Sequence, residues 1–465
     1  MAAPTIIRGS DQFFITTYEG NGGGQKVGKF VPFTDNATIA KSCIFDSASN
    51  VSLTRTPGSA GNRKTFTVSF WVKRGRLGDA AGNNTYGQRI FNAGTSSNWF
   101  DIKFSGSGDT EGADRLHLRE YASSAEKLEY WTNRTFEDNS KWYHIVVQVN
   151  TTESTSTNRI KIYVDGDQIT SWYRSNAPAQ DYDTQVNATV LHNIGRYTGA
   201  TSNNLDAYLA EVNFVDGSIV APSTFGLTDT STGRWIPKSL TGITYGTNGF
   251  RMEYANSAGQ TIGDDTSGQG NDYAVSNIAT TDLTTDSPTQ NFATGFHNQT
   301  DNGTMTLSEG NLKIVQGTNT AKFSSLRSSL ILDPNDPNLY YCEYKVDLEH
   351  GGNGNVVGFS DIRADGKKAD SSDLRMDIGT NYMFACDTYV IHEIDGADVG
   401  TGNNATVNPE FTTNDVMGLA FQAGKIWIAK NNTWSSSGNP GAGTGFLLEL
   451  PKNTKYRFYA GQYGS

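Results

Sequence analysis

The stretch WYHIVVQVNTTESTSTNRIKIYVDGDQI, residues 142–169, decides the fold class. Apolar side chains recur at every second position over 143–149 and again over 160–164, and a period of two places them on one face of a strand. A loop rich in Ser and Thr separates these runs. Asp165-Gly166 follows the second run and favours a tight turn, because Gly tolerates positive φ and Asp bonds to the local backbone. The stretch therefore predicts two antiparallel strands and a tight turn.

The composition of the whole chain extends this prediction to an all-β fold. The 465 residues include 50 Gly, 21 Tyr and 23 Phe, which favours short strands separated by turns. The length predicts two or three domains, each able to bury a core. The formal net charge of −11 argues against nucleic acid as a partner, because phosphate binding needs clustered Lys and Arg.

The sequence shows no signal for export or for membrane insertion. Its start, MAAPTIIRGSDQFF, lacks a cationic stretch followed by an apolar core, and no apolar run approaches the ~18–20 residues that span a bilayer. We therefore expect synthesis in a cytoplasm and no membrane insertion. Cys43, Cys342 and Cys386 are far apart in the chain, which predicts buried free thiols rather than disulfides.

The strand pattern divides the chain into four parts. Residues 1–40 are interrupted by Pro and Gly, so we expect either an arm that docks on a larger assembly or strands that cover the next domain. Residues 41–222 alternate strand and turn patterns and predict two packed antiparallel sheets. Residues 223–300 form an irregular connecting segment, rich in Thr, Ser, Gly and Asp, with short strands. Residues 301–465 resume the strand pattern and predict a second β-sandwich.

Four motifs of the first sandwich resemble the laminin G-like, or concanavalin A-like, jelly roll. In chain order they are FTVSFWVKRG (66–75), KWYHIVVQVN (141–150), RIKIYVDGDQI (159–169) and NIGRYTGATSNNLDAYLAEVNFVDGSIV (193–220). The closing strand of that family often carries an acidic pair. This chain has Ala210 before Glu211, and the departure argues against a calcium site of the family type.

Motifs of the last part resemble the SPRY domain, another bent β-sandwich. They are YYCEYKV (340–346), NVVGFS (355–360) and VMGLAFQAGKIWIAKNNTW (416–434). SPRY domains are binding modules, so the resemblance implies that loops of this sandwich select a partner.

The order of these parts, together with RGSDQFF (8–14) and DDTSGQGND (264–272), resembles virion structural proteins of tailed bacteriophages, especially marine ones. The resemblance implies a tail-fibre, head-fibre or capsid-decorating protein, located on the virion and present in many copies or as a homo-oligomer. Its expected partners are other virion proteins, bound through the N-terminal arm, and a glycan or protein of the host surface. The alternatives are a secreted polysaccharide-degrading enzyme and a decoration protein without any ligand.

The sequence offers no catalytic constellation, so we expect that the protein is not an enzyme. A glycosidase of this fold class needs paired carboxyl groups, and the run from Glu393 to Asp398 comes nearest to Glu-x-Asp-x-Glu without completing it. The six histidines are scattered without metal-binding spacing, and no GxSxG nucleophile motif occurs.

The candidate binding residues lie in two rim loops that combine aromatic rings with Asn or Asp. Rings pack against sugar faces and polar groups bond the hydroxyls, whereas the alternative is that Asn serves only the turn. A polar turn offers oxygen ligands for Ca²⁺, although such a turn needs no metal, and we expect no other cofactor. The candidates are Tyr197, Asn203, Asn204 and Asp206 in the first sandwich, Asn431, Asn432 and Trp434 in the second, and Asp264, Asp265 and Asp272 for calcium.

Overall fold

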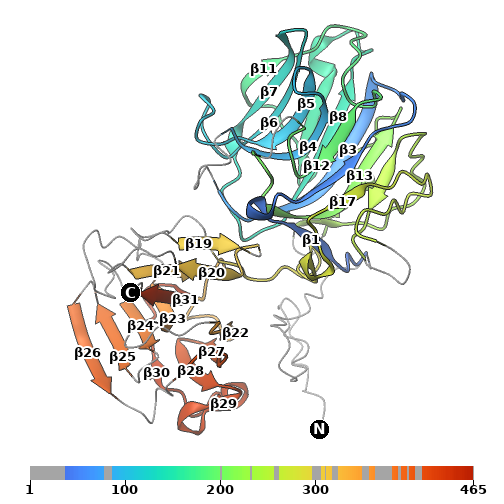
Figure 1. The fold of residues 1–465 in the computed structure, drawn as a ribbon. Coiled ribbons are helices and arrows are strands. Elements are labelled where there is room, and N and C mark those ends of the chain that lie inside the picture. Colours follow the sequence, from blue (N-terminus) through green and yellow to red (C-terminus); the bar gives the residue numbers. More distant parts are fainter. Residues whose placement is uncertain are drawn as a thin grey trace. The chain divides into compact units, whose positions relative to one another are not determined.

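The computed structural model describes residues 37–77, 86–198, 202–230, 233–255, 261–295, 305–308, 310–316, 323–347, 355–361, 380–385, 389–394, 397–403 and 411–463. The described residues fall into two compact units, one within residues 32–291 and the other within residues 292–465 (Figure 1). The described elements are strands and three-residue 3₁₀ turns, which confirms the predicted all-β fold. Within the described part, no helix has the length and apolarity to cross a membrane.

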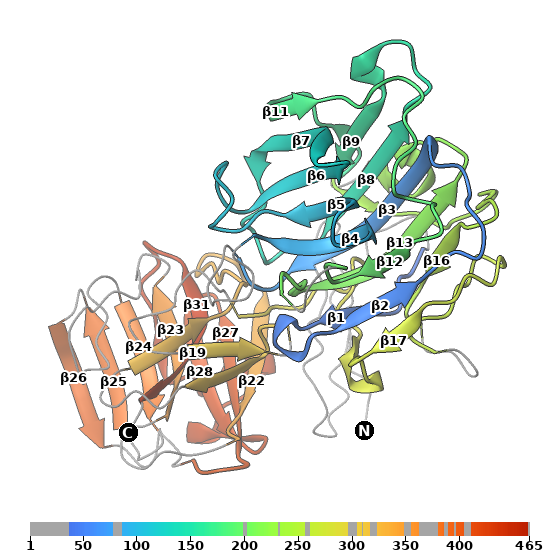
Figure 2. The ribbon, with the colours of Figure 1, turned by 45° about the horizontal axis from the view of Figure 1, so that its top comes forward.

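Two antiparallel sheets form the unit of residues 32–291 (Figure 2). The first sheet runs in the order β10 (Asp167–Gln168), β9 (Ile160–Val164), β8 (Tyr143–Asn150), β3 (Thr65–Arg74), β13 (Ala207–Asp216), β1 (Ser42–Phe45) and β18 (Leu283–Thr284), with β16 (Phe250–Met252) also paired to β13. The second sheet runs in the order β11 (Trp172–Asn176), β7 (Ala125–Thr135), β6 (Arg115–Ala122), β5 (Trp99–Phe104), β4 (Gln88–Gly94), β12 (Leu191–Ile194), β2 (Ser52–Arg55) and β17 (Ala274–Ser276).

The hairpin predicted over residues 142–169 is confirmed. Strand β8 pairs with β9 in the register Ile145↔Val164 and Val149↔Ile160. The next turn, between β9 and β10, has φ of 54° at Asp165 and 86° at Gly166, and two positive φ values are the mark of a type I′ hairpin turn.

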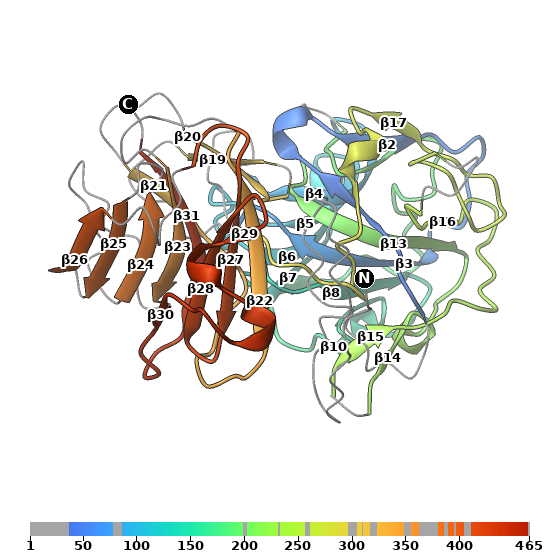
Figure 3. The same cartoon turned by 90° about the horizontal axis from the view of Figure 1, so that it is seen from below.

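The central strands of the first sheet, β8, β3 and β13, are buried on both faces. The sheet's inner face packs against the second sheet around residues such as Val68, Phe70 and Ile145. Its outer face is covered by the segment that follows β13, which places Phe225 and Tyr245 against Val146. Figure 3 shows the small hairpin of β14 (Gly226–Thr228) and β15 (Trp235–Pro237) beside β10.

Of the connecting segment predicted over residues 223–300, residues 223–291 belong to the first unit. Strand β16 pairs with β13, β17 pairs with β2, and β18 pairs with β1. The backbone N–H of Ile39 donates to Oγ1 of Thr289 at 3.2 Å, and Oγ of Ser287 donates to the Ile39 carbonyl at 2.7 Å. The two ends of the unit are therefore bonded to each other. Residues 1–36 of the expected docking arm lie outside the described residues.

The described part of the second unit contains two larger antiparallel sheets and one two-stranded sheet. Its predicted strands over 339–346, 355–360 and 416–430 are confirmed, and Cys342 is buried and free, as is Cys43 in the first unit; Cys386 lies outside the described residues. One sheet has the order β21 (Phe323–Arg327), β31 (Tyr456–Tyr463), β23 (Asn355–Asp361), β24 (Thr380–Ala385), β25 (Tyr389–Ile394) and β26 (Ala397–Asn403). The other has the order β22 (Leu339–Lys345), β27 (Val416–Gln422), β28 (Lys425–Lys430) and β29 (Thr433–Trp434), with β30 (Leu448–Glu449) on β28, and β19 (Met305–Ser308) pairs separately with β20 (Lys313–Gln316).

Candidate functional site

The face of the second sheet that points away from the core is polar, yet its central side chains are buried. Asp101, Lys103 and His117 alternate with core residues along β5 and β6 and are at most 2% exposed. Burying polar groups is costly unless they are paired. This face must therefore be held by an internal network.

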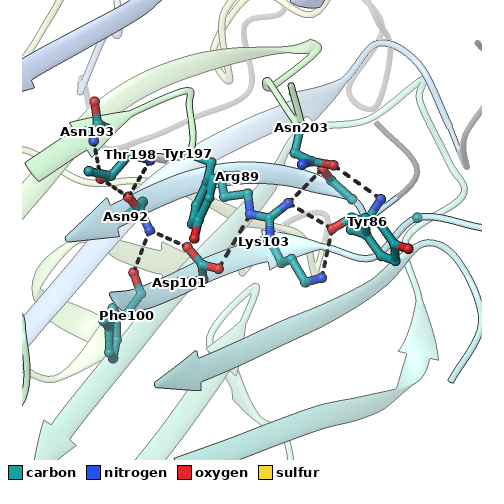
Figure 4. A network of polar contacts seen from close by, with 12 residues as sticks. Tyr86, Arg89, Asn92, Phe100, Asp101, Lys103, Asn193, Tyr197, Thr198 and Asn203 are labelled. Carbon is teal, nitrogen blue, oxygen red and sulfur yellow. Dashed lines mark hydrogen bonds and ion pairs between the residues drawn. The ribbon is translucent and has the colours of Figure 1, made fainter. Parts of the chain in front are cut away.

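Asn92 is the centre of one half of this network (Figure 4). Its Nδ2 donates to the Asp101 carboxylate and, at 3.1 Å, to the Phe100 carbonyl. Its Oδ1 accepts from the backbone N–H of Thr198 at 3.0 Å and from the Thr198 hydroxyl. The amide of Asn193 in turn donates to the Thr198 hydroxyl oxygen at 2.7 Å. These bonds tie the loop after β12 firmly to β4 and β5.

Arg89 and Lys103 form the other half of the network, and both donate to the carbonyl of Tyr86, at 2.9 and 2.8 Å. Nε of Arg89 lies 3.4 Å from Asp101, and Nζ of Lys103 lies 2.9 Å from both oxygens of Asp109. Burial, with a further contribution from Arg89, lowers the pKa of Lys103 to about 8 despite Asp109. The network is thus a rigid floor rather than a set of free charges.

Three partly exposed aromatic rings and one guanidinium lie beside this floor, and we call them the aromatic patch: Trp99, Arg119, Tyr121 and Tyr197. Trp99 stacks on Tyr121 with ring centroids 4.8 Å apart and meets Tyr197 edge to face at 5.9 Å. The Arg119 guanidinium lies 5.7 Å from the Trp99 ring and 5.6 Å from the Tyr121 ring. Tyr197 packs over Arg89 at 5.0 Å, so the floor fixes the position of the patch.

Two carboxyl groups border the aromatic patch on β7. Glu126 pairs with Arg119, and Glu129 accepts from Nε1 of Trp131 at 2.8 Å and from Arg174 at 3.0 Å. Burial and hydrogen bonding with Glu129 raise the pKa of Glu126. Burial alone would also raise the pKa of Glu129, but the contact with His117 at 3.5 Å and the hydrogen bonds from Trp131 and Arg174 outweigh it and lower that pKa.

The rim residues predicted in the first sandwich separate into two groups. Tyr197 belongs to the aromatic patch, and Asn203, at φ of 63°, accepts the backbone N–H of Tyr86 at the edge of the floor. Asn204 and Asp206 point inward: Nδ2 of Asn204 donates to Asn50 at 2.8 Å, and Asp206 accepts from the Ser47 hydroxyl at 3.0 Å. Burial raises the pKa of Asp206. These two residues hold the loop in place.

The rim residues predicted in the second sandwich are turn residues with one aromatic neighbour. Asn431 and Asn432 have φ of 47° and 66° between β28 and β29, and this is turn chemistry suited to Asn. The Asn431 amide accepts from the backbone N–H of Val416 at 2.9 Å and donates to Asp415 at 2.7 Å. The ring of Trp434 lies 5.9 Å from that of Tyr341.

The calcium candidates stabilise their own turn. Asp265 accepts backbone N–H groups from Arg251 and Asn271, each at 2.9 Å, and Asp272 accepts that of Asp265 at 2.8 Å. Asp264 accepts the backbone N–H of Thr261 at 2.7 Å. In the part of the chain that the structure describes, no three His, Cys, Asp or Glu side chains gather as a metal site requires.

Sequence reasoning missed Trp99, Arg119 and Tyr121, although their pattern was available. In WFDIKF (99–104) and RLHLREY (115–121), polar or aromatic side chains alternate with buried apolar ones. Such alternation puts one set on a single face of a strand. The presence of this face could therefore be predicted from the sequence. The position of Tyr197, which comes from a distant loop, could not.

Residues 45–222 match the model of the Concanavalin A-like lectin/glucanases superfamily. The first unit contains a laminin G-like jelly roll. No curated protein matches the chain in sequence.

Solved structures similar to the chain include domains LG4-5 of the mouse laminin alpha1 chain, at 9% identity and a TM-score of 0.31, covering 92% of this chain and 83% of that one. A putative carbohydrate binding protein from Bacteroides ovatus has 16% identity and a TM-score of 0.35, with 54% of this chain and 62% of that one covered. The SPRY domain of human HERC1 has 14% identity and a TM-score of 0.22, with 33% and 80% covered. Full-length tailspike protein 2 of Escherichia coli O157:H7 bacteriophage CAB120 has 11% identity and a TM-score of 0.25, with 40% and 27% covered.

The closing strand of the jelly roll, β13, departs from regular geometry at Glu211. The pairing of β13 with β3 shifts between Ala210 and Asn213, and Glu211 has a φ of 48°. This bulge directs the Glu211 carboxylate to Arg251, whose Nε and Nη2 each lie 2.9 Å from one of its oxygens. The acidic residue that follows Ala210 in this strand is therefore engaged by a cation of the chain itself.

Proposed function

We propose that the protein is a virion component of a tailed bacteriophage whose jelly roll binds a glycan of the host surface through the aromatic patch. The observation that carries the binding function is the stacking of Trp99 and Tyr121 beside Tyr197 on a buried, hydrogen-bonded floor. The superfamily match of residues 45–222 supports a lectin-type role. The virion role is supported by the resemblance of the motif order to phage structural proteins.

The chemistry of the aromatic patch suits a sugar. The apolar side of a pyranose packs on an aromatic face, while hydroxyl groups need donors and acceptors at its edge. Arg119 supplies donors, and Glu126 supplies acceptors at the same border. Because the rings are held in place before binding, little side-chain entropy is lost when a ligand arrives.

The carboxyl groups beside the aromatic patch favour binding over hydrolysis. A retaining glycosidase holds its two carboxyl groups ~5–5.5 Å apart, and an inverting one holds them farther apart. Glu126 and Glu129 instead interact directly with each other and with Arg119 and Arg174. They lack the gap in which a glycosidic bond would lie, and we propose that the protein is not an enzyme.

Attachment through this site would depend on many copies. Linked sites on one particle raise avidity by ~10²–10⁴ over a single site, so a shallow patch is sufficient. We propose that the N-terminal arm joins the protein to other virion proteins, and that the aromatic patch faces away from the virion.

The test is a glycan array combined with binding to whole host cells. Trp99→Ala and Tyr197→Ala should each lower binding by at least tenfold, since each removes a stacking face. Tyr173→Ala is the matched control, because Tyr173 is an aromatic residue of β11 outside the patch and is 51% exposed. The absence of binding by the wild type in both assays would refute adhesion and support a decoration protein without a ligand. Release of reducing ends from an array glycan would refute the non-enzymatic proposal.

A further inference from the structure

A cavity of ≈ 370 Å³ lies on the outer face of the first sheet, within the unit of residues 32–291. This volume falls in the range of small-molecule sites, ~300–1,000 Å³. It is separated from the aromatic patch by the thickness of the sandwich, since the patch lies on the other sheet. Its lining combines rings with polar groups: Trp71, Phe225, Ser69, His144, Glu211 and Arg251.

The backbone of Glu211 is strained at the wall of this cavity. A non-glycine residue at φ of 48° is uncommon, and bulges of this kind redirect side chains next to binding sites. Here the bulge brings the Glu211 carboxylate into the cavity lining, where the Arg251 guanidinium holds it in place.

His144 and Ser69 form a bonded pair on the floor of the cavity, with Nε2 and Oγ 2.9 Å apart. Nδ1 of His144 accepts a hydrogen bond from Nε1 of Trp235 at 3.0 Å. Because an indole N–H can only donate, Nδ1 is unprotonated and Nε2 carries the proton of the neutral ring. His144 therefore donates to Ser69.

This arrangement gives Ser69 a binding role and excludes a nucleophilic one. A general base must accept the serine proton, but Nε2 of His144 already carries a proton. The Ser69 hydroxyl accepts from His144 and keeps its own proton to donate, and no acceptor for that proton lies among the described residues. The floor of the cavity thus presents one fixed hydrogen-bond donor.

The charges around the cavity are balanced. Arg251 pairs with Glu211 and, at 2.8 Å, with Glu253, while Lys238 lies exposed at the opening. The two positive charges, on Arg251 and Lys238, equal the two negative charges, on Glu211 and Glu253. Neither an anion nor a cation therefore gains a net attraction. We propose that this cavity binds a neutral monosaccharide, with Trp71 and Phe225 against its apolar side, the Ser69 hydroxyl as donor and the Glu211–Arg251 pair bonding further hydroxyls.

The test is saturation-transfer NMR on the full chain with D-glucose and D-galactose, and with glucuronate and glucosamine as charged counterparts. All samples carry Trp99→Ala, which removes the aromatic patch from the readout. We expect a saturable signal from at least one neutral sugar. Ser69→Ala should weaken binding about five- to tenfold, because one hydrogen bond to the ligand is lost.

Ser239→Trp provides the blocking variant, because Ser239 lines the cavity and is exposed at its opening. It should abolish the signal, while Ser154→Trp, the same change in the exposed loop after β8, should leave it intact. No saturable signal from either neutral sugar would overturn the proposal, as would a signal that survives Ser239→Trp or a preference for a charged sugar. Binding that is found only when Trp99 is restored would overturn the cavity site and support the aromatic patch instead.

Discussion

Nε1 of Trp235 lies 3.0 Å from Nδ1 of His144, and this bond links the segment after β13 to the hairpin strand β8. The ring of Trp235 also stacks against His144 with centroids 6.0 Å apart. Trp71 packs on His144 from β3 at 4.6 Å. A buried histidine is thereby held in one tautomer by a neighbour from a distant part of the sequence.

Trp235→Phe should remove this hydrogen bond while keeping most of the ring. We expect a loss of about 1–3 kcal/mol in the free energy of unfolding, because Nδ1 becomes a buried acceptor without a donor. Urea unfolding measures the loss, and nitrogen chemical shifts of His144 report the tautomer. An unchanged tautomer population in the variant would show that Trp235 does not fix it.

The stability of the protein should fall as the pH drops below about 6.5. Burial lowers the pKa of His144 to about 3 and that of His192 to about 4. A group whose pKa is lower in the folded state than in the unfolded state stabilises the folded state at pH values above its unfolded-state pKa. This stabilisation is lost as the pH falls from the unfolded-state pKa to the folded-state pKa. Between pH 6.5 and 5 we expect a loss of about 2 kcal/mol per histidine.

Unfolding titrations at a series of pH values measure this loss, and His192→Gln should reduce its slope by about one proton. His192 accepts the backbone N–H of Asn187 at 3.0 Å and donates to the Val190 carbonyl, which the Gln amide can imitate. An identical slope in the variant would contradict the assignment.

Glu120 should make the stability of the protein fall as the pH rises, the opposite direction from the histidines. Burial raises its pKa to about 8, although Tyr182 and the backbone N–H of Gln185 donate to it at 2.9 and 3.0 Å. A raised folded-state pKa means that stability is fully present below the unfolded value and is lost as the pH rises through the folded value. Between pH 6 and 8 we expect a loss of about 2–3 kcal/mol.

Glu120→Gln imitates the protonated carboxyl and should remove this loss. The variant should therefore be more stable than the wild type at pH 9, as measured by chemical unfolding. A variant that is less stable at every pH would show that the carboxyl is needed in its charged form.

Gly166→Ala should destabilise the protein beyond the ordinary cost of a positive φ. A Cβ on Gly166, at φ of +86°, would lie 2.5 Å from the Trp235 ring. Gly233 has a φ of +69° and no atom within 4 Å of such a Cβ. Gly233→Ala should cost about 1 kcal/mol, and Gly166→Ala at least twice that. Equal costs in thermal unfolding would show that the contact with Trp235 yields without penalty.

The sequence was most informative where neighbours along the chain determine the structure. The alternation in β8 and β9 and the Asp165-Gly166 turn could be read directly, because strand period and turn chemistry are local. Nothing local distinguishes the inward-pointing Asn204 from Asn203, since both are small polar residues in one turn. Tyr197 and Trp99 are brought together by the pairing of β12 with β4 and of β4 with β5, so the aromatic patch could not be assembled from the sequence.

The bonds between Ile39 and residues 287–289 have a mechanical consequence. A pull applied through the chain enters and leaves this unit at nearly the same point, where Ile39 meets Thr289 and where Ser42 lies opposite Thr284. The force therefore acts directly on these few hydrogen bonds, while the long strands of the sandwich lie outside the path of the force. Under tension the bonds between Ile39 and residues 287–289 would break first, and the aromatic patch would keep its geometry.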